Sequence, residues 1–265
     1  MIQFNLNRFC KVAKWSLTVD RGFYLRNLLN VFVIMSLFFI AFTTRFFHIY
    51  VNDNDSAYSP CVAATMIMLF ITIVTGPSWM FSSMKGKHDL QTLLMLPASN
   101  LEKYLMRYST WILLLPLYIV AFFGADLVQY LVNVIWGNEN LTFVTTVVIN
   151  NLSDTFTKLP KETSRPILHG VVVFVLLFHS VYALGGTFFR SHKFAWALST
   201  VILIVLTMIQ FWLIPTGDWG IADKQTPMST IVLTDAIYGV LTLFNFWLSY
   251  KLFCRTQVIG KFVNI

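Results

Sequence analysis

Charged residues are scarce in this sequence. Asp, Glu, Lys and Arg make up only 12% of the 265 residues, whereas 57% are apolar and 16% are aromatic. Soluble domains carry about 25% charged residues, so the composition argues against a water-soluble protein. We therefore predict an integral membrane protein.

Cysteine is also scarce. The three cysteines, Cys10, Cys61 and Cys254, show no paired spacing, and two of them lie in or beside apolar stretches. This pattern indicates neither a disulfide framework nor a metal cluster. We expect the cysteines to serve in packing.

Motifs for nucleotide chemistry are missing as well. A phosphate-binding loop at Gly86-Lys87 would need glycine at position 81 and serine or threonine at position 88, but Phe81 and His88 stand there. Residues 82–85 fit the Ser-x-x-Lys pattern of some acyl-enzymes, but its companion motifs are absent. We expect no catalytic residue and no cofactor bound by this chain itself.

Long apolar windows dominate what remains. About 20 apolar residues cross a bilayer as a helix. Such windows cover residues 28–44, 61–81, 110–132, 167–189, 195–214 and 234–254. We expect an all-α fold with six transmembrane helices in residues 27–265. No small-residue cleavage site follows the first window, so we expect it to be retained as a span.

The basic residues are distributed by membrane side. The formal net charge is +7, and 14 of the 19 lysines and arginines lie before the first window, in the connections after the second and fourth, or from the last turn of the sixth window onward. The positive-inside rule places these segments, and hence both termini, in the cytoplasm. Because the basic residues do not cluster on one soluble surface, nucleic acid is not an expected partner.

Residues 1–26 precede the first window and contain an amphipathic pattern. At helical spacing, residues such as Leu6 and Val12 share one face, while Lys11 and Lys14 lie on the other. A basic amphipathic helix lies in the membrane interface with its cations near anionic headgroups, so we expect membrane lipid as a partner. A disordered basic tail is the alternative.

The connection at residues 82–108 is a long polar interruption on the basic side. Asp89 and Pro97 are plausible start and stop signals for a short helix over residues 90–96. We expect an apolar ridge on that helix to face the cytosol or the membrane. The ridge consists of Leu90, Leu93 and Leu94.

A second helix is predicted to start after Ser99. Ser99 and Glu102 match a capping box, in which each side chain accepts a hydrogen bond from the other residue's backbone amide. No strong helix breaker follows before Pro116. A helix continuing into the third window covers about 30 residues, roughly 45 Å, so its first turns must project beyond a hydrocarbon core of about 30 Å.

Glycine and proline mark two further local features. Gly76-Pro77 predicts a kink or an early end of the second span. Gly185-Gly186 allows close helix approach near the end of the fourth. The external loop at residues 133–166 contains one apolar piece, residues 141–149, for which a strand and a surface-lying segment remain open.

Three ionisable residues lie in or near spans. His179 is near the centre of the fourth window, and Asp126 and Asp235 lie toward the predicted outer ends of the third and sixth. Intramembrane ionisable groups mark substrate paths or make structural hydrogen bonds. A translocation path through these residues is one reading; a bonded histidine and interfacial aspartates are the other.

These features together resemble a known family. The six spans, the basic amphipathic start and the segment Leu-Pro-Ala-Ser-Asn-Leu-Glu-Lys at residues 96–103 resemble the permease subunits of type-2 ATP-binding-cassette (ABC) transporters, particularly those of Bacteroidetes. The resemblance implies that residues 1–26 are an elbow helix and that residues 82–108 contain a coupling helix. The coupling residues it implies are Leu90, Leu93, Leu94, Leu96, Pro97, Ser99, Glu102 and Lys103.

The resemblance also implies partners. A separate cytoplasmic ABC ATPase subunit would bind the ATP, and a second permease subunit, identical or different, would complete a twelve-span dimer in the bacterial inner membrane. The long external loop at residues 133–166 departs from the family pattern. The substrate path would carry an amphiphilic or peptide-like molecule.

Other functions remain open at this point. A membrane-embedded enzyme could use His179 and an aspartate, and a small channel would need no ATPase. A scaffold or sensor subunit would bind an ATPase but move nothing.

Overall fold

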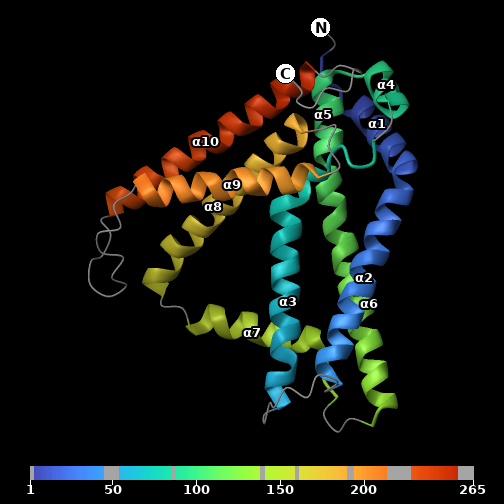
Figure 1. The fold of residues 1–265 in the computed structure, drawn as a ribbon, viewed down its shortest axis with the longest axis vertical. Coiled ribbons are helices and arrows are strands. Elements are labelled where there is room, and N and C mark those ends of the chain that lie inside the picture. The colour runs from blue at the N-terminus through green and yellow to red at the C-terminus, as the bar shows by residue number, and fades with distance from the viewer. Residues whose placement is uncertain are drawn as a thin grey trace. The chain divides into compact units, whose positions relative to one another are not determined.

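The computed structural model describes residues 3–44, 54–84, 87–137, 141–158, 161–189, 194–213 and 228–255. These residues form ten α-helices and one 3₁₀ turn, with no strand among them (Figure 1). The predicted all-α architecture is therefore confirmed for the described part of the chain.

The helices have the following bounds. They are α1 (Leu6–Val19), α2 (Arg21–Thr43), α3 (Asn54–Thr75), the 3₁₀ turn η1 (Gly76–Trp79), α4 (Lys87–Met95), α5 (Asn100–Tyr108), α6 (Thr110–Ile135), α7 (Val144–Lys158), α8 (Lys161–Phe188), α9 (Ala195–Leu213) and α10 (Met228–Cys254).

Five helical segments of the described chain are long and apolar enough to cross a membrane. They are Arg21–Thr43, Tyr58–Trp79, Asn100–Ile135, His169–Phe188 and Val232–Cys254. The window at residues 195–214 contains a shorter apolar helix, Ala195–Val205. A multi-pass membrane protein is thus supported, while the sixth span and the cytoplasmic termini remain predictions.

The chain divides into two compact units. Unit 1 comprises Met1–Ser16, Val74–Trp111 and Arg165–Ile265, and unit 2 comprises Leu17–Ile73 and Ile112–Ser164. Each unit has its own buried apolar cluster, and each is described separately.

The larger core of unit 1 joins elements that are distant in sequence. Met80, Leu93, Met106, Ala183 and Phe253 are at most 2% exposed and belong to one cluster. They bring together η1 and the helices α4, α5, α8 and α10. The close packing depends on glycine, because a Cβ atom at Gly186 would lie 2.9 Å from the Pro77 carbonyl oxygen. This confirms the predicted close approach at Gly185-Gly186.

The core of unit 2 lies among α2, α3, α6 and α7. Met35, Phe39, Cys61, Ala125 and Val144 are at most 1% exposed and share one cluster. Phe39 also packs edge-on against Phe122, with ring centroids 6.1 Å apart. The buried thiol of Cys61 acts as a small apolar side chain here.

Local signals located several boundaries correctly. α3 ends at Thr75 and the chain continues as a 3₁₀ turn from Gly76, which confirms the predicted early end. Ser99 is the N-cap of α5, which confirms the predicted start of that helix. α5 and α6 are separated only at Ser109, so the predicted long helix is present with one interruption.

Other boundaries differ from the sequence predictions. The amphipathic helix α1 ends at Val19. Helix α2 begins at Arg21, which is before the apolar window that starts at residue 28. α4 begins at Lys87, which puts Asp89 in its first turn and corrects the expectation of an N-cap there. The segment at residues 141–149, left open from sequence, leads into helix α7.

Candidate functional site

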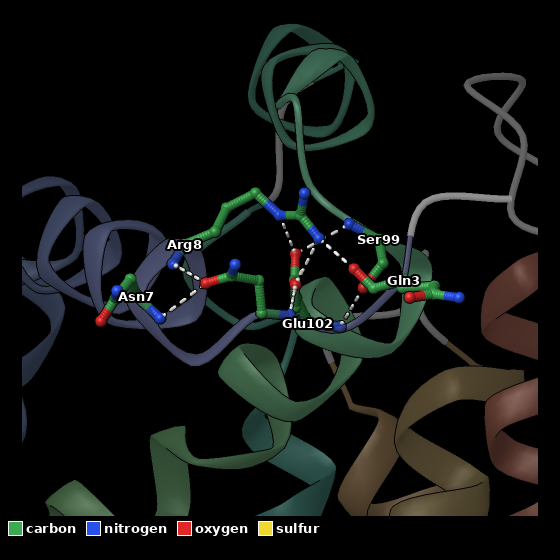
Figure 2. Close-up of polar contacts among 6 residues, drawn as sticks. Gln3, Asn7, Arg8, Ser99 and Glu102 are labelled. Atoms are coloured by element: carbon green, nitrogen blue, oxygen red, sulfur yellow. Dashed lines mark hydrogen bonds and ion pairs between the residues drawn. The ribbon is translucent and has the colours of Figure 1, made fainter.

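The carboxylate of Glu102 is the centre of a hydrogen-bond network at the start of α5 (Figure 2). Arg8 donates from Nε to Oε2 and from Nη2 to Oε1, each at 2.7 Å. The backbone amide of Asn5 donates to Oε1 at 2.7 Å, and that of Ser99 donates to Oε2 at 2.9 Å. Glu102 is 0% exposed, so these four bonds replace its hydration.

Two helix caps meet in this network. The Ser99 hydroxyl accepts from the Glu102 amide at 3.3 Å, which completes the capping box of α5. The Asn5 side chain accepts from the amides of Asn7 and Arg8 at 2.9 and 3.3 Å, which caps α1. Since Asn5 also donates to Glu102, the starts of α1 and α5 are fixed to each other.

The network has a marked electrostatic effect. α5 carries three charged residues in nine positions and lies before the apolar helix α6, so we place it outside the hydrocarbon core. The Arg8 guanidinium, together with the amides of Asn5 and Ser99, lowers the pKa of Glu102 to about 2 against the opposing effect of desolvation. In turn, the carboxylate raises the pKa of Arg8.

Lys103 connects α5 to α4. Its Nζ donates to the Leu94 carbonyl oxygen at 2.7 Å, although the side chain is only 5% exposed. A cation at the carboxyl end of a helix satisfies a carbonyl that has no partner within the helix. Lys103 therefore anchors the end of α4 on α5.

The leucine ridge of α4 faces inward, which corrects the sequence expectation. Leu93 is 0% exposed and Leu90 is 7% exposed, and both belong to the apolar cluster of unit 1. Leu94 and Leu96 are partly buried against the same cluster. Met95 is instead 83% exposed. Leu93 is therefore a core residue, while Met95 lies on the outward side of α4.

The other face of α5 contacts α10 and α8. Tyr104 donates from its hydroxyl to Ser249 at 3.0 Å, and the Tyr108 hydroxyl lies 2.6 Å from His179 Nε2. Thr187 donates to the same Ser249 oxygen at 3.2 Å. α5 is thus bonded on one side to α1 and α4 and on the other to α8 and α10.

His179 lies in an aromatic setting. It is 4% exposed, and its ring is 4.7 Å from that of Trp111 and 6.3 Å from that of Phe246. With its bond to Tyr108, these contacts favour the structural alternative for this histidine. Neither the resemblance nor the local sequence identified Tyr108, although Tyr104 and Tyr108 share a face by their four-residue spacing.

Asp126 has a different role in unit 2. Its carboxylate accepts from the amides of Val144 and Thr145 at 2.8 and 2.9 Å and from the Thr145 hydroxyl at 2.6 Å. At 2% exposure it caps the start of α7 from within α6. The expectation that water at the membrane interface solvates Asp126 is wrong, because its carboxylate oxygens accept hydrogen bonds from protein donors.

Asp235 pairs with a histidine that the sequence reading did not single out. His169 Nδ1 lies 2.7 Å from Asp235 Oδ2 and joins α8 to α10 within unit 1. The three residues proposed for a translocation path thus make separate contacts: His179 with Tyr108, Asp235 with His169, and Asp126 with α7 in unit 2. Over the described ranges, no group of three His, Cys, Asp or Glu residues could hold a metal ion.

Comparison with known proteins identified no similar protein. No protein-family model, curated protein or solved structure matches this chain.

The Arg8 and Asn5 contacts were missed from sequence. Arg8 lies 94 positions from Glu102, and no local pattern predicts which of several nearby cations reaches it. Asn5 could have been found, because asparagine is a preferred N-cap residue immediately before the helical pattern that starts at Leu6.

Proposed function

We propose that this chain is the membrane-spanning permease subunit of an ABC transporter. It forms a path for an amphiphilic or peptide-like substrate and is driven by ATP hydrolysis in a separate cytoplasmic subunit. The complete transporter includes a second permease subunit, identical or different, in the bacterial inner membrane. The proposal starts from the resemblance carried by residues 96–103 and is supported by the surroundings of α5.

The supporting observation is the two-sided attachment of α5. Glu102 and Lys103 bind α1 and α4 on one side, and Tyr104 and Tyr108 bind α10 and α8 on the other. A helix attached in this way carries a displacement of α4 into the apolar helices as a rigid-body movement. This is the mechanical requirement for coupling ATP hydrolysis in a partner to a membrane path.

We propose Met95 as the contact point on α4 in place of the leucine ridge. Because Leu93 is buried, an ATPase subunit cannot contact it without unfolding the core of unit 1. Met95 is 83% exposed and is the apolar side chain that α4 offers to a partner. Exposed apolar anchors of this kind carry much of the energy of protein interfaces.

The test is affinity purification of the tagged chain from its native host in mild detergent. We expect a subunit with Walker and ABC signature motifs to co-purify, and we expect Met95→Glu to reduce its recovery at least about fivefold. Ile135→Glu is the matched control, since Ile135 is also 83% exposed but ends α6 at the predicted external side.

One result would contradict the ABC assignment, and another would contradict only the contact at Met95. If no such ATPase accompanies the wild-type chain, the ABC assignment fails. If the ATPase accompanies both variants undiminished, the assignment stands and the contact is not at Met95. Transport of a solute by the purified chain alone in vesicles would favour the channel alternative.

A further inference from the structure

Helix α7 runs across the other helices of unit 2. Figure 1 shows α2, α3 and α6 extending in a common direction, whereas α7 lies crosswise to them. It packs into the core of that unit, because Val144 and Val148 belong to the same buried cluster as Cys61 and Val62 of α3. A helix that crosses membrane-spanning helices in this way lies near the plane of the membrane.

The start of α7 is held at a defined level of α6. Asp126 accepts hydrogen bonds from Val144 and Thr145, and Tyr130 stacks on Phe143 with ring centroids 4.3 Å apart. These contacts hold the start of α7 against the second half of α6, within unit 2.

The surface of α7 has three flanks. Val144 and Val148 are 0% and 9% exposed and face the core of unit 2. Ile149 and Leu152, at i and i+3, are 59% and 42% exposed and form an apolar flank beside that core face. Thr146 and Asn150, at i and i+4, are exposed polar residues on the side of α7 turned away from the core; this is the division expected of a helix between acyl chains and water.

Unit 2 exposes apolar side chains on α6 as well as on α7. The last turns of α6, in the same unit, expose Leu131, Val134 and Ile135 at 51%, 46% and 83%, as expected of a helix surrounded by lipid. Trp136, which follows α6, is 68% exposed, and tryptophan is enriched at membrane interfaces. Lipid is therefore the partner that fits this side of α7.

We propose that α7 is an in-plane membrane-surface helix at the end of α6. Its Ile149–Leu152 flank contacts lipid acyl chains, and its Thr146–Asn150 flank faces water. Asp126 holds the start of α7 on α6. This inference depends only on the membrane character of the chain and stands or falls separately from the transporter proposal.

Spin labels on neighbouring positions test the assignment in the full chain. Cys10→Ser and Cys254→Ser remove the exposed thiols, and Cys61, at 0% exposure, can stay. The single labelled variants are Thr146→Cys, Ile149→Cys, Asn150→Cys and Leu152→Cys. Each is reconstituted in phosphatidylethanolamine–phosphatidylglycerol vesicles, and collisions of the label with oxygen and with a water-soluble nickel chelate are measured.

We expect the labels at 149 and 152 to collide mainly with oxygen, and those at 146 and 150 to collide mainly with the nickel chelate. The four positions control for each other, since all are exposed on one helix. Equal access of the nickel chelate to all four labels would show that α7 stands in water. Protection of 149 and 152 from both reagents would show that protein covers the flank. Either result overturns the proposal.

Discussion

Leu93→Ala tests whether α4 packs inward. Leu93 is 0% exposed in the main cluster of unit 1, and the substitution removes three buried carbons. Their transfer accounts for about 2.4 kcal/mol at about 0.8 kcal/mol per carbon, and the residual cavity brings the expected loss of unfolding free energy to about 2–5 kcal/mol. Met95→Ala, at 83% exposure, should change it by less than about 0.5 kcal/mol.

The assay is thermal unfolding of both variants in the same detergent. Unfolding is measured as the loss of the monodisperse peak in size-exclusion chromatography. A loss of about 2–5 kcal/mol corresponds to a decrease of roughly 4–20 °C in the unfolding temperature for a chain of this size. Alanine is a strong helix former, so helix propensity does not account for such a decrease.

An unchanged unfolding temperature for Leu93→Ala would refute the inward packing. The sequence expectation of an outward leucine ridge would then stand, and Leu93 would return as a candidate contact for the ATPase. If the temperature falls while Met95→Ala leaves it unchanged, loss of ATPase binding by a Leu93 variant reports unfolding and not a lost contact.

Two further predictions concern helix junctions. Because the pKa of Glu102 is lowered from 4.5 to about 2 in the folded chain, its contribution to stability is present above about pH 4.5 and is lost as the pH falls toward 2. Glu102→Gln should unfold at lower temperature than wild type at pH 7, and the difference should shrink in acid; a constant difference would show that the charge is unimportant. Gly186→Ala should destabilise by about 1–3 kcal/mol, since a Cβ atom would lie 2.9 Å from the Pro77 carbonyl oxygen and 3.0 Å from the Ser78 Cα. Gly239→Ala in α10 is its control, with nothing within 4 Å of the added carbon and an expected gain of about 0.5–1 kcal/mol. Equal effects of the two alanines in thermal unfolding would contradict the close approach at Gly186.

The sequence by itself determined the features that depend on near neighbours. Five of the six apolar windows located helices long and apolar enough to cross a membrane, because helix length and bilayer thickness are both fixed. Ser99 and Glu102 specified the start of α5, and Gly76-Pro77 specified the end of α3. Caps and prolines act within one turn of the backbone, so their effects can be read without knowing the fold.

Only the tertiary structure decided which sides of these helices meet. Helical spacing showed that Leu90 and Leu93 share a face, but spacing cannot tell whether that face meets the core or a partner. The contacts Arg8–Glu102 and Asp126–Val144 join residues 94 and 18 positions apart. Such pairs form because a buried carboxylate must find donors wherever the packed helices supply them, and the sequence does not specify that packing locally.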